Sequence, residues 1–172
     1  MDLIGSSCRL QPTTADDRDA LLAIRSAPEV RLWWRGDDLV EEFEDSLANT
    51  DLHLLNIWAT PDGESHERIV GLIQYEEEHD PDYRHAGIDI YIDPAAHRQG
   101  FALDSLATLI DHLCTERGHH RITIDPAADN AAAIACYAKV GFEPVGVMRS
   151  YERREDGSWS DSLLMELVRF GS

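Results

Sequence analysis

The chain has 172 residues, of which 15 are Lys or Arg and 33 are Asp or Glu, giving a formal net charge of −18. This acidic balance argues against nucleic acid or an anionic membrane as a partner and favours cationic ligands. The sequence also lacks both a run of eighteen apolar residues and the pattern of a secretory signal, so we expect neither a membrane span nor export.

Short helices and strands alternate along the first half of the chain. Apolar spacing predicts a strand, two helices and a hairpin of two strands, over residues 8–11, 20–27, 39–47, 52–59 and 69–75. Thr13 or Thr14 can begin the first helix, and Pro28 ends it. Residues 76–83 are strongly acidic, so we predict a solvated connection there, too polar for the interior of a sheet.

The rest of the chain is expected to be organised around residues 88–102. Alternating isoleucines predict a strand over residues 88–92, which Pro94 ends. A short loop then closes on Gly100, and an amphipathic helix is predicted over residues 101–117. The first N–H groups of such a helix are free and can bind an anionic phosphate group.

The last third of the chain predicts a short strand, a helix and two antiparallel strands, over residues 121–125, 130–140, 142–148 and 159–168. Asn130 can cap the helix and Gly141 can end it. Residues 152–158 are predicted to form a charged turn. This order predicts an α/β (α+β) fold, a mixed and mostly antiparallel sheet flanked by helices, as one domain of residues 1–172.

Histidine and cysteine show no spacing that would hold a metal ion. The eight histidines lack a helical ligand pair, and His119 and His120 are expected to be solvated in a turn. The three cysteines lack the paired spacing of a zinc site or a disulfide framework, so we expect reduced thiols in a cytoplasmic protein without a metal.

The loop His97-Arg-Gln-Gly100-Phe-Ala102 resembles the acyl-CoA loop of the GCN5-related N-acetyltransferase (GNAT) superfamily. That loop has Gln or Arg, two residues, Gly, one residue, and then Gly or Ala, so His97 departs from the pattern. Asn130, Tyr137 and Gly141-Phe142 extend the resemblance, which covers nearly the whole chain. It implies the GNAT fold and acetyl-CoA as the co-substrate.

A narrower resemblance is to the aminoglycoside 6′-N-acetyltransferases. It is carried by Trp33-Trp34-Arg-Gly-Asp37-Asp38, by Gly87-Ile-Asp89, and by residues 125–142. The tryptophan-acid segment and Asp89 are the pieces that discriminate, because Tyr137 and Gly141-Phe142 belong to the wider superfamily.

The superfamily resemblance implies a set of residues that bind the co-substrate. In that family the central strand separates from the next one, and the pantetheine arm pairs with its exposed edge. The backbone N–H groups of residues 98–102 would receive the pyrophosphate, and Gly100 would let the backbone approach. The full set is Ile90, Tyr91, Ile92, His97, Arg98, Gln99, Gly100, Phe101, Ala102, Asn130, Ala133, Tyr137 and Lys139.

The resemblance also implies direct acetyl transfer from acetyl-CoA to a neutral amine. Asp89 is the candidate base, although a free carboxyl pKa of about 4 requires burial or a relaying water, and a purely structural or anchoring role stays open. Tyr137 is the candidate acid for the departing thiolate, with a core tyrosine as the alternative. Cys136 is its neighbour, but the two side chains point about 100° apart on a helix, and no His-Cys arrangement supports a thiol nucleophile.

Acidic and aromatic residues are the candidates for holding the acceptor. The tryptophans can provide a flat wall for a sugar ring, with core packing as the alternative, and carboxylates can face ammonium groups. The candidates are Trp33, Trp34, Asp37, Asp38, Tyr75, Asp89, Asp125 and Asp161.

Three functions are consistent with these residues. The first is acetylation of a primary amine of a cationic small molecule, above all the 6′-amine of aminoglycosides, as in antibiotic resistance. The second is acetylation of a protein or peptide amine, and the third is a non-catalytic acyl-CoA-binding module. The oligomeric state, monomer or homodimer, stays open.

Overall fold

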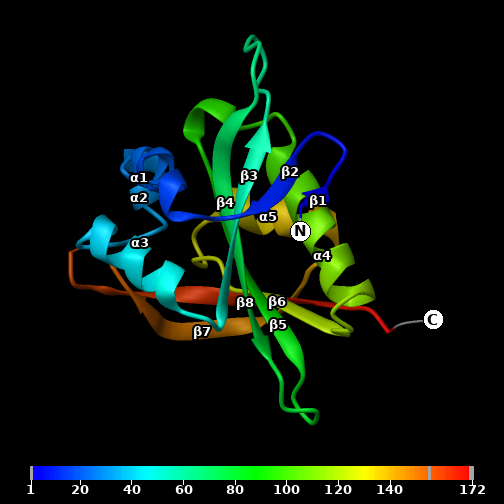
Figure 1. Ribbon diagram of the computed structural model, residues 1–172. Coiled ribbons are helices and arrows are strands. Elements are labelled where there is room, and N and C mark those ends of the chain that lie inside the picture. Colours follow the sequence, from blue (N-terminus) through cyan, green and yellow to red (C-terminus); the bar gives the residue numbers. More distant parts are fainter. Residues whose placement is uncertain (1, 155, 171–172) are drawn as a thin grey trace.

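The computed structural model describes residues 2–154 and 156–170. These residues form an eight-stranded sheet in the order β1-β2-β3-β4-β5-β6-β8-β7 (Figure 1). Neighbouring strands are antiparallel except for β5 and β6, which are parallel. The strands are β1 (Leu3–Ile4), β2 (Arg9–Pro12), β3 (Leu52–Ala59), β4 (Arg68–Glu78), β5 (His85–Ile92), β6 (Arg121–Ile124), β7 (Glu143–Arg153) and β8 (Trp159–Val168).

The helices begin and end at residues suited to those positions. Asp38 caps α3 by accepting hydrogen bonds from the N–H groups of Val40 and Glu41. Asn130 caps α5 through the N–H of Ala133, and Gly141 ends that helix at φ +112°. The helices are α1 (Arg18–Arg25), α2 (Pro28–Arg31), α3 (Leu39–Ala48), α4 (Phe101–Thr115) and α5 (Ala131–Val140), with 3₁₀ turns at Ala15–Asp17 and Pro94–Ala96.

The sheet separates two hydrophobic cores. Helix α4 lies on one side of β3 and β4, whereas α1, α2 and α3 lie on the other (Figure 1). The core under α4 includes the fully buried Leu106, Leu109 and Leu113. The second core includes Leu21 of α1 and Leu72 of β4. The central strands are therefore held on both faces, which fixes the elements that carry the candidate site.

The predicted fold class is confirmed. Strands β3 and β8 have the predicted bounds, and α5 begins after the predicted cap. The structure adds β1 and the single turn of α2, which is too short to show a helical period. It also ends α4 at Thr115, two residues before the predicted end.

Two acidic segments were wrongly predicted to be connections. Glu76, Glu77 and Glu78 belong to β4, and β7 extends to Arg153 across part of the predicted charged turn. Glu77 can lie within β4 because it pairs with residues that are distant in the sequence. The side chain of Glu77 is only 2% exposed, and its carboxylate meets Arg117 at 2.6 Å.

Glu77 also explains why the prediction of a solvated His119 is wrong. His119 is 1% exposed, and its Nε2 lies 2.7 Å from Glu77 Oε1. Burial alone would raise the pKa of Glu77, but hydrogen bonds from Arg117 and His119 outweigh burial and hold it at about 2. This charged contact attaches β4 to the segment between α4 and β6.

Candidate active site

The turn before α4 presents unpaired backbone donors. Gly100 has φ +87° and Arg98 has φ +62°, so the chain turns sharply into the helix. Among the described residues, no hydrogen-bond acceptor faces the backbone N–H groups of residues 98–102. A Cβ at Gly100 would meet no atom within 4 Å, so the approach to these donors is open. This arrangement fits the pyrophosphate of CoA.

Two side chains of the loop support the turn. His97 Nε2 donates to the carbonyl oxygen of Ile92 at 3.0 Å, which ties the turn to the end of β5. Gln99 Oε1 accepts from the N–H of Asp62 at 2.7 Å, in the turn between β3 and β4. Gln99 is therefore directed away from the cavity described below, whereas the prediction placed it in contact with the co-substrate.

Strand β5 has an open edge beside this turn. Its pairing with β6 is limited to Ala86 with Ile122 and Gly87 with Thr123. The N–H of Asp93 donates toward β4, and backbone groups alternate in direction along a strand. The backbone groups of residues 88, 90 and 92 therefore point away from β4. Ile88 adjoins the last β6 pair and the carbonyl of Ile92 is bonded to His97, so an extended ligand can pair as an added strand with the groups of Ile90 between them.

A cavity of about 760 Å³ connects the open edge, the start of α4 and the start of α5. Most of the predicted co-substrate residues line it: Ile90, Tyr91, Ile92, His97, Arg98, Gly100, Phe101, Ala102, Asn130, Ala133, Tyr137 and Lys139. Its other end is lined by Trp33, Trp34, Asp89, Asp125 and Glu152. One cavity thus brings the phosphate-binding turn and the carboxylates together.

Asp89 lies on β5 where the strand leaves β6. Solvent reaches its carboxylate through the cavity, yet protein atoms surround it, and Gln74 Nε2 donates to Oδ2 at 3.3 Å. Desolvation by the cavity walls raises the pKa of Asp89, and the hydrogen bond from Gln74 opposes the shift. A carboxylate with a raised pKa is a better proton acceptor than a free one.

Tyr137 lies on α5 and is 8% exposed, with its ring packed edge-on near Phe142. Burial raises the pKa of its phenol, and Cys136, Asp89 and Asp125 add to the shift. The phenol therefore keeps its proton until a strong base appears. Burial also raises the pKa of the Cys136 thiol, which leaves little thiolate for nucleophilic attack.

Asp125 and Glu152 complete a group of three carboxylates with Asp89. Burial raises the pKa of Asp125 to about 6, and the charges of Asp89 and Glu152 contribute, while Tyr151 opposes the shift through a hydrogen bond. Burial also raises the pKa of Glu152; the charge of Asp89 adds to the shift, whereas those of Arg154 and Arg35 oppose it. Mutual repulsion of this kind is relieved when a cation enters.

Both tryptophans line the cavity, and Trp34 also packs against the second core. Its ring lies edge-on to Tyr91 with centroids 4.8 Å apart, and the Arg25 guanidinium lies 5.2 Å from its centroid. Arg35, which follows the two tryptophans, donates from Nη1 to the carbonyl of Arg153 at 3.2 Å. This hydrogen bond connects the Trp33–Trp34 segment to the end of β7.

Four predicted acceptor residues lie elsewhere. Asp38 caps α3, Asp37 pairs with Arg35 at 3.4 Å on the surface, and Asp161 accepts from the N–H of Ser150 at 2.8 Å. Tyr75 has its side chain on the opposite face of the sheet from Asp89, because the side chains of successive residues alternate along a strand. These four candidate acceptor residues therefore do not line the cavity that contains Asp89 and Asp125.

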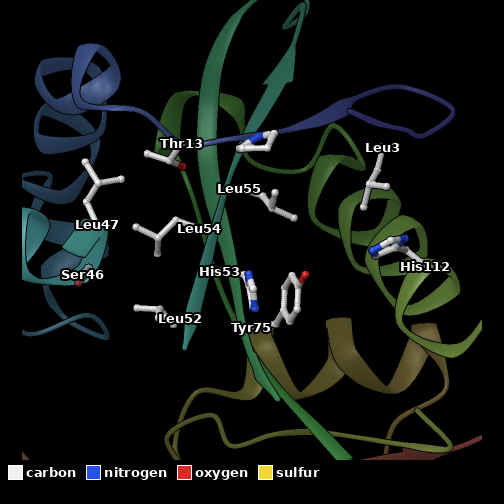
Figure 2. Close-up of a pocket in the computed structure, with 11 residues that line it drawn as sticks. Leu3, Thr13, Ser46, Leu47, Leu52, His53, Leu54, Leu55, Tyr75 and His112 are labelled. Carbon is white, nitrogen blue, oxygen red and sulfur yellow. The ribbon is translucent and has the colours of Figure 1, made fainter. Parts of the chain in front are cut away.

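Tyr75 lines a second, smaller cavity of about 350 Å³. Figure 2 shows its ring beside the imidazole of His53, with Ser46 and Leu47 of α3 on one side and His112 of α4 on the other. The two rings stack with centroids 4.5 Å apart. This cavity is separate from the candidate active site.

Glu152, Tyr151 and Gln74 were not predicted as site residues. Glu152 and Tyr151 were missed because the strand was predicted to end at residue 148 and residues 152–158 were interpreted as a turn, whereas β7 continues to Arg153. Gln74 pairs with Asp89 across β4 and β5, and directly paired residues have their side chains on the same face of the sheet. In the sequence, the strand period of two places Gln74 on the same face as Leu72.

The described residues give no metal or membrane-spanning element. Across residues 2–154 and 156–170, no group of three or more His, Cys, Asp or Glu side chains is arranged to hold a metal ion. Within the same ranges, every helix is too short or too polar to cross a bilayer. Cys8, Cys114 and Cys136 are free thiols.

Comparisons with known proteins bear on this geometry. A family model described as an acetyltransferase (GNAT) domain matches residues 8–143. The chain is 38% identical over 79 residues to the [ribosomal protein bS18]-alanine N-acetyltransferase of Escherichia coli K12, covering 46% of this chain and 52% of that protein. It is 33% identical over 145 residues to the mycothiol acetyltransferase of Nocardia farcinica, covering 80% of this chain and 45% of that protein. The matched segments thus span about half the length of these relatives.

A solved structure similar to this one is the spermidine N-acetyltransferase from Vibrio cholerae in complex with CoA and spermine. It superposes with a TM-score of 0.78 and 18% identity, covering 95% of this chain and 96% of that one. At this identity the similarity concerns the fold. The narrower resemblance to aminoglycoside enzymes rests on the sequence motifs alone.

Proposed function

The chain belongs to the GNAT family of acetyltransferases, and on this premise we propose that it transfers the acetyl group of acetyl-CoA directly to a primary amine of a cationic small molecule. One observation carries the proposal. A single cavity contains the unpaired N–H groups before α4, the open edge of β5, the phenol of Tyr137 and three carboxylates. The first two features suit CoA, and the carboxylates suit a cationic acceptor.

The chemistry assigns a role to each group. The acceptor arrives as an ammonium ion, and Asp89 takes its proton directly or through a water, which frees the nitrogen lone pair. The nitrogen attacks the thioester carbonyl, whose oxygen can be polarised by N–H groups on the open edge of β5. The new C–N bond forms as the C–S bond breaks, and Tyr137 gives its proton to the departing thiolate. The nitrogen, positively charged after the attack, loses its second proton to the tyrosinate, directly or through a water, which leaves a neutral amide and restores Tyr137.

The finer proposal for the acceptor is an aminoglycoside, acetylated at its 6′-amine. The sequence motifs around Trp33 and Asp89 support it, as do the walls that the two tryptophans give the cavity. Carboxylates around the cavity can hold further ammonium groups of such a molecule. Each charge-assisted hydrogen bond contributes about 1.5–3 kcal/mol.

A second candidate acceptor is the N-terminal amine of a protein or peptide. The observation in its favour is the 38% identity to an enzyme that is named for an alanine of ribosomal protein bS18. A peptide amine is a single cation, however, and leaves two of the three carboxylates without a partner. A non-catalytic acyl-CoA-binding module would need neither the carboxylates nor Tyr137.

A thiol-release assay tests the proposal. The full chain with acetyl-CoA is challenged with kanamycin-type aminoglycosides, polyamines and peptides with free N-termini. We expect release of CoA with the small polycations and mass spectrometry showing one added acetyl group. Release with peptides alone would establish the second candidate, and acetyl-CoA binding without release for any acceptor would indicate the non-catalytic module.

A further inference from the structure

Strand β7 contains a bulge where it passes the candidate active site. Met148 pairs with Ser162 and Glu152 pairs with Ser160, so four steps along β7 oppose two steps along β8. Ser150, inside the bulge, has φ +50°, a conformation that non-glycine residues rarely adopt. A bulge beside a functional site changes the direction of the side chains that follow it.

Asp161 of β8 fixes this bulge from the opposite strand. Its Oδ1 accepts from the N–H of Ser150 at 2.8 Å. The backbone of β8 at this point is joined to the segment after β6, because Ala128 N–H donates to the carbonyl of Asp161 at 2.9 Å and Leu163 N–H donates to that of Pro126 at 2.8 Å. The bulge is therefore held against the segment that carries Asp125.

The bulge directs two side chains toward the candidate acceptor end of the cavity. Tyr151 and Glu152 both line it. The phenol of Tyr151 faces the carboxylate of Asp125, and Glu152 interacts electrostatically with Asp89. The backbone carbonyl of Glu152 accepts from Ser160 Oγ at 3.2 Å, which fixes the position from which its side chain extends.

The cations that line the same cavity leave this end acidic. Arg98 and Lys139 come from the turn before α4 and from α5, where the phosphates of CoA are expected. Arg35 bonds to the carbonyl of Arg153 and pairs with Asp37, and Arg154 pairs with Asp129 at 2.6 Å, although both cations also act electrostatically on Glu152. With Asp89 assigned to the reacting amine, a second positive charge on the acceptor has a place beside Asp125 and Glu152.

We propose that Tyr151 and Glu152 are specificity-determining residues that hold a second ammonium group of the acceptor, and that Asp161 is a positioning residue that fixes the bulge carrying them. This inference rests on the proposed function and defines its substrate class as amines with at least two positive charges. Asp161 acts through the backbone of Ser150 and does not touch the acceptor.

Matched acceptors and matched variants test the inference. The acceptors are α,ω-diaminoalkanes of three to eight carbons and n-alkylamines of the same lengths, so that each pair differs by one ammonium group. The variants of the full chain are E152Q, Y151F, D161A and D161N. Asn at position 161 keeps an oxygen that can accept from Ser150. D156N is the control, because Asp156 lies in the β7–β8 turn, where its Oδ1 accepts from the N–H and the hydroxyl of Ser158, and it does not line the cavity.

We expect the wild-type chain to prefer diamines in kcat/KM. E152Q lowers that preference about tenfold, the size of one charge-assisted hydrogen bond, and does so mainly through the KM of the diamine. D161A shifts the preference in the same direction, D161N restores most of it, and D156N leaves it unchanged. Y151F gives a smaller loss, since it removes one hydroxyl.

Calorimetric titration of the same amines in the presence of CoA gives a readout that does not need turnover. The inference is overturned if E152Q loses affinity equally for diamines and monoamines, or if D161A keeps the wild-type preference for diamines. If these variants still transfer the acetyl group, the proposed function stands. If no amine binds and none is acetylated, both fail together. Binding of diamines without acetylation supports the inference and contradicts the proposed chemistry.

Discussion

The two ends of the candidate active site are built in different ways. The end that suits CoA comes from two continuous pieces of chain, β5 with the turn into α4, and the start of α5. It acts through backbone groups, namely the free N–H groups of residues 98–102 and the open edge of β5. The acceptor end draws single side chains from β5, the end of β6, β7 and the α2–α3 loop, and it acts through charge.

This difference determines how each end responds to mutation. A backbone site tolerates most side-chain changes and fails where the backbone conformation changes. A site of clustered carboxylates fails when one charge is removed, and it responds to pH because the pKa values are raised by burial and by neighbouring charges.

The largest effect is expected between the two ends, at Tyr137. Tyr137→Phe removes the proton donor for the thiolate while keeping the ring that packs near Phe142. We expect kcat to fall about 10²–10³-fold with little change in the KM of acetyl-CoA, as for loss of a general acid. Steady-state thiol release measures both constants.

Cys136→Ala is the matched variant on the same helix. Direct transfer requires it to keep most of the wild-type kcat. Loss of activity in Cys136→Ala, together with an acetylated cysteine in the wild-type chain by mass spectrometry, would contradict direct transfer and indicate a covalent route.

The second largest effect is expected at Asp89, in the group of carboxylates. Asp89→Asn keeps the side chain's shape and its contact with Gln74 but removes the proton acceptor. We expect kcat/KM to fall about 100-fold and the rise of rate with pH through the acidic limb to disappear. A pH–rate profile from pH 5 to 9 checks this. An unchanged profile would leave Asp89 with an anchoring role only.

The backbone end is tested at Gly100, with Gly63 as the control. Both glycines have positive φ, +87° and +82°, and at both a Cβ would meet no atom within 4 Å. Alanine therefore costs about 1 kcal/mol of backbone strain at either position. Only Gly100→Ala places a methyl group where the phosphates approach, so only it should raise the KM of acetyl-CoA, about tenfold. Equal KM values in the two variants would contradict the predicted role of the turn.

The smallest effect is on stability, at Asp125. Its folded pKa of about 6 lies above the ordinary value of 3.8, so the folded state binds the proton more tightly than the unfolded state. The free energy of unfolding therefore falls as pH rises between these values. Above pH 6 the folded state bears the full cost of the ionised Asp125 carboxylate. After allowance for partial exposure, we expect Asp125→Asn to raise the free energy of unfolding by about 1 kcal/mol at pH 7.5 and by almost nothing near pH 4.

Urea unfolding at the two pH values measures this difference. Asp156→Asn is the control, because hydrogen bonds from Ser158 lower the pKa of Asp156 and its removal should not stabilise the chain. A stabilisation of Asp125→Asn that is the same at both pH values would show that its origin is not the ionised carboxylate.

The sequence allowed prediction of the elements whose signals are local. The largely apolar strand over residues 52–59, the cap at Asn130 and the glycine turn before α4 all appear where expected. The extension of β4 was missed because Arg117 and His119, which pair with Glu77, lie about 40 residues further along the chain. The acidic pattern by itself is typical of a loop.

The same distinction between local signals and contacts of distant residues applies to the candidate site. All the residues predicted to bind the co-substrate except Gln99 line one cavity, and most of them come from the contiguous stretch of β5 and the turn into α4. At the acceptor end, Asp125 lies in the cavity, whereas Asp37, Asp38 and Asp161 serve as a surface ion pair, a helix cap and a strand contact. Acidic side chains fill all these roles equally well, and only the fold distinguishes them.

The open edge of β5 has two fixed ends, which bound the stretch of strand that a ligand can pair with. At one end His97 occupies the carbonyl of Ile92, and at the other β6 pairs with Gly87. Four residue steps between Ile88 and Ile92 span about 13 Å at 3.3 Å each. An extended arm that pairs with this edge therefore has one short stretch of strand to occupy, bounded by His97 on one side and by β6 on the other.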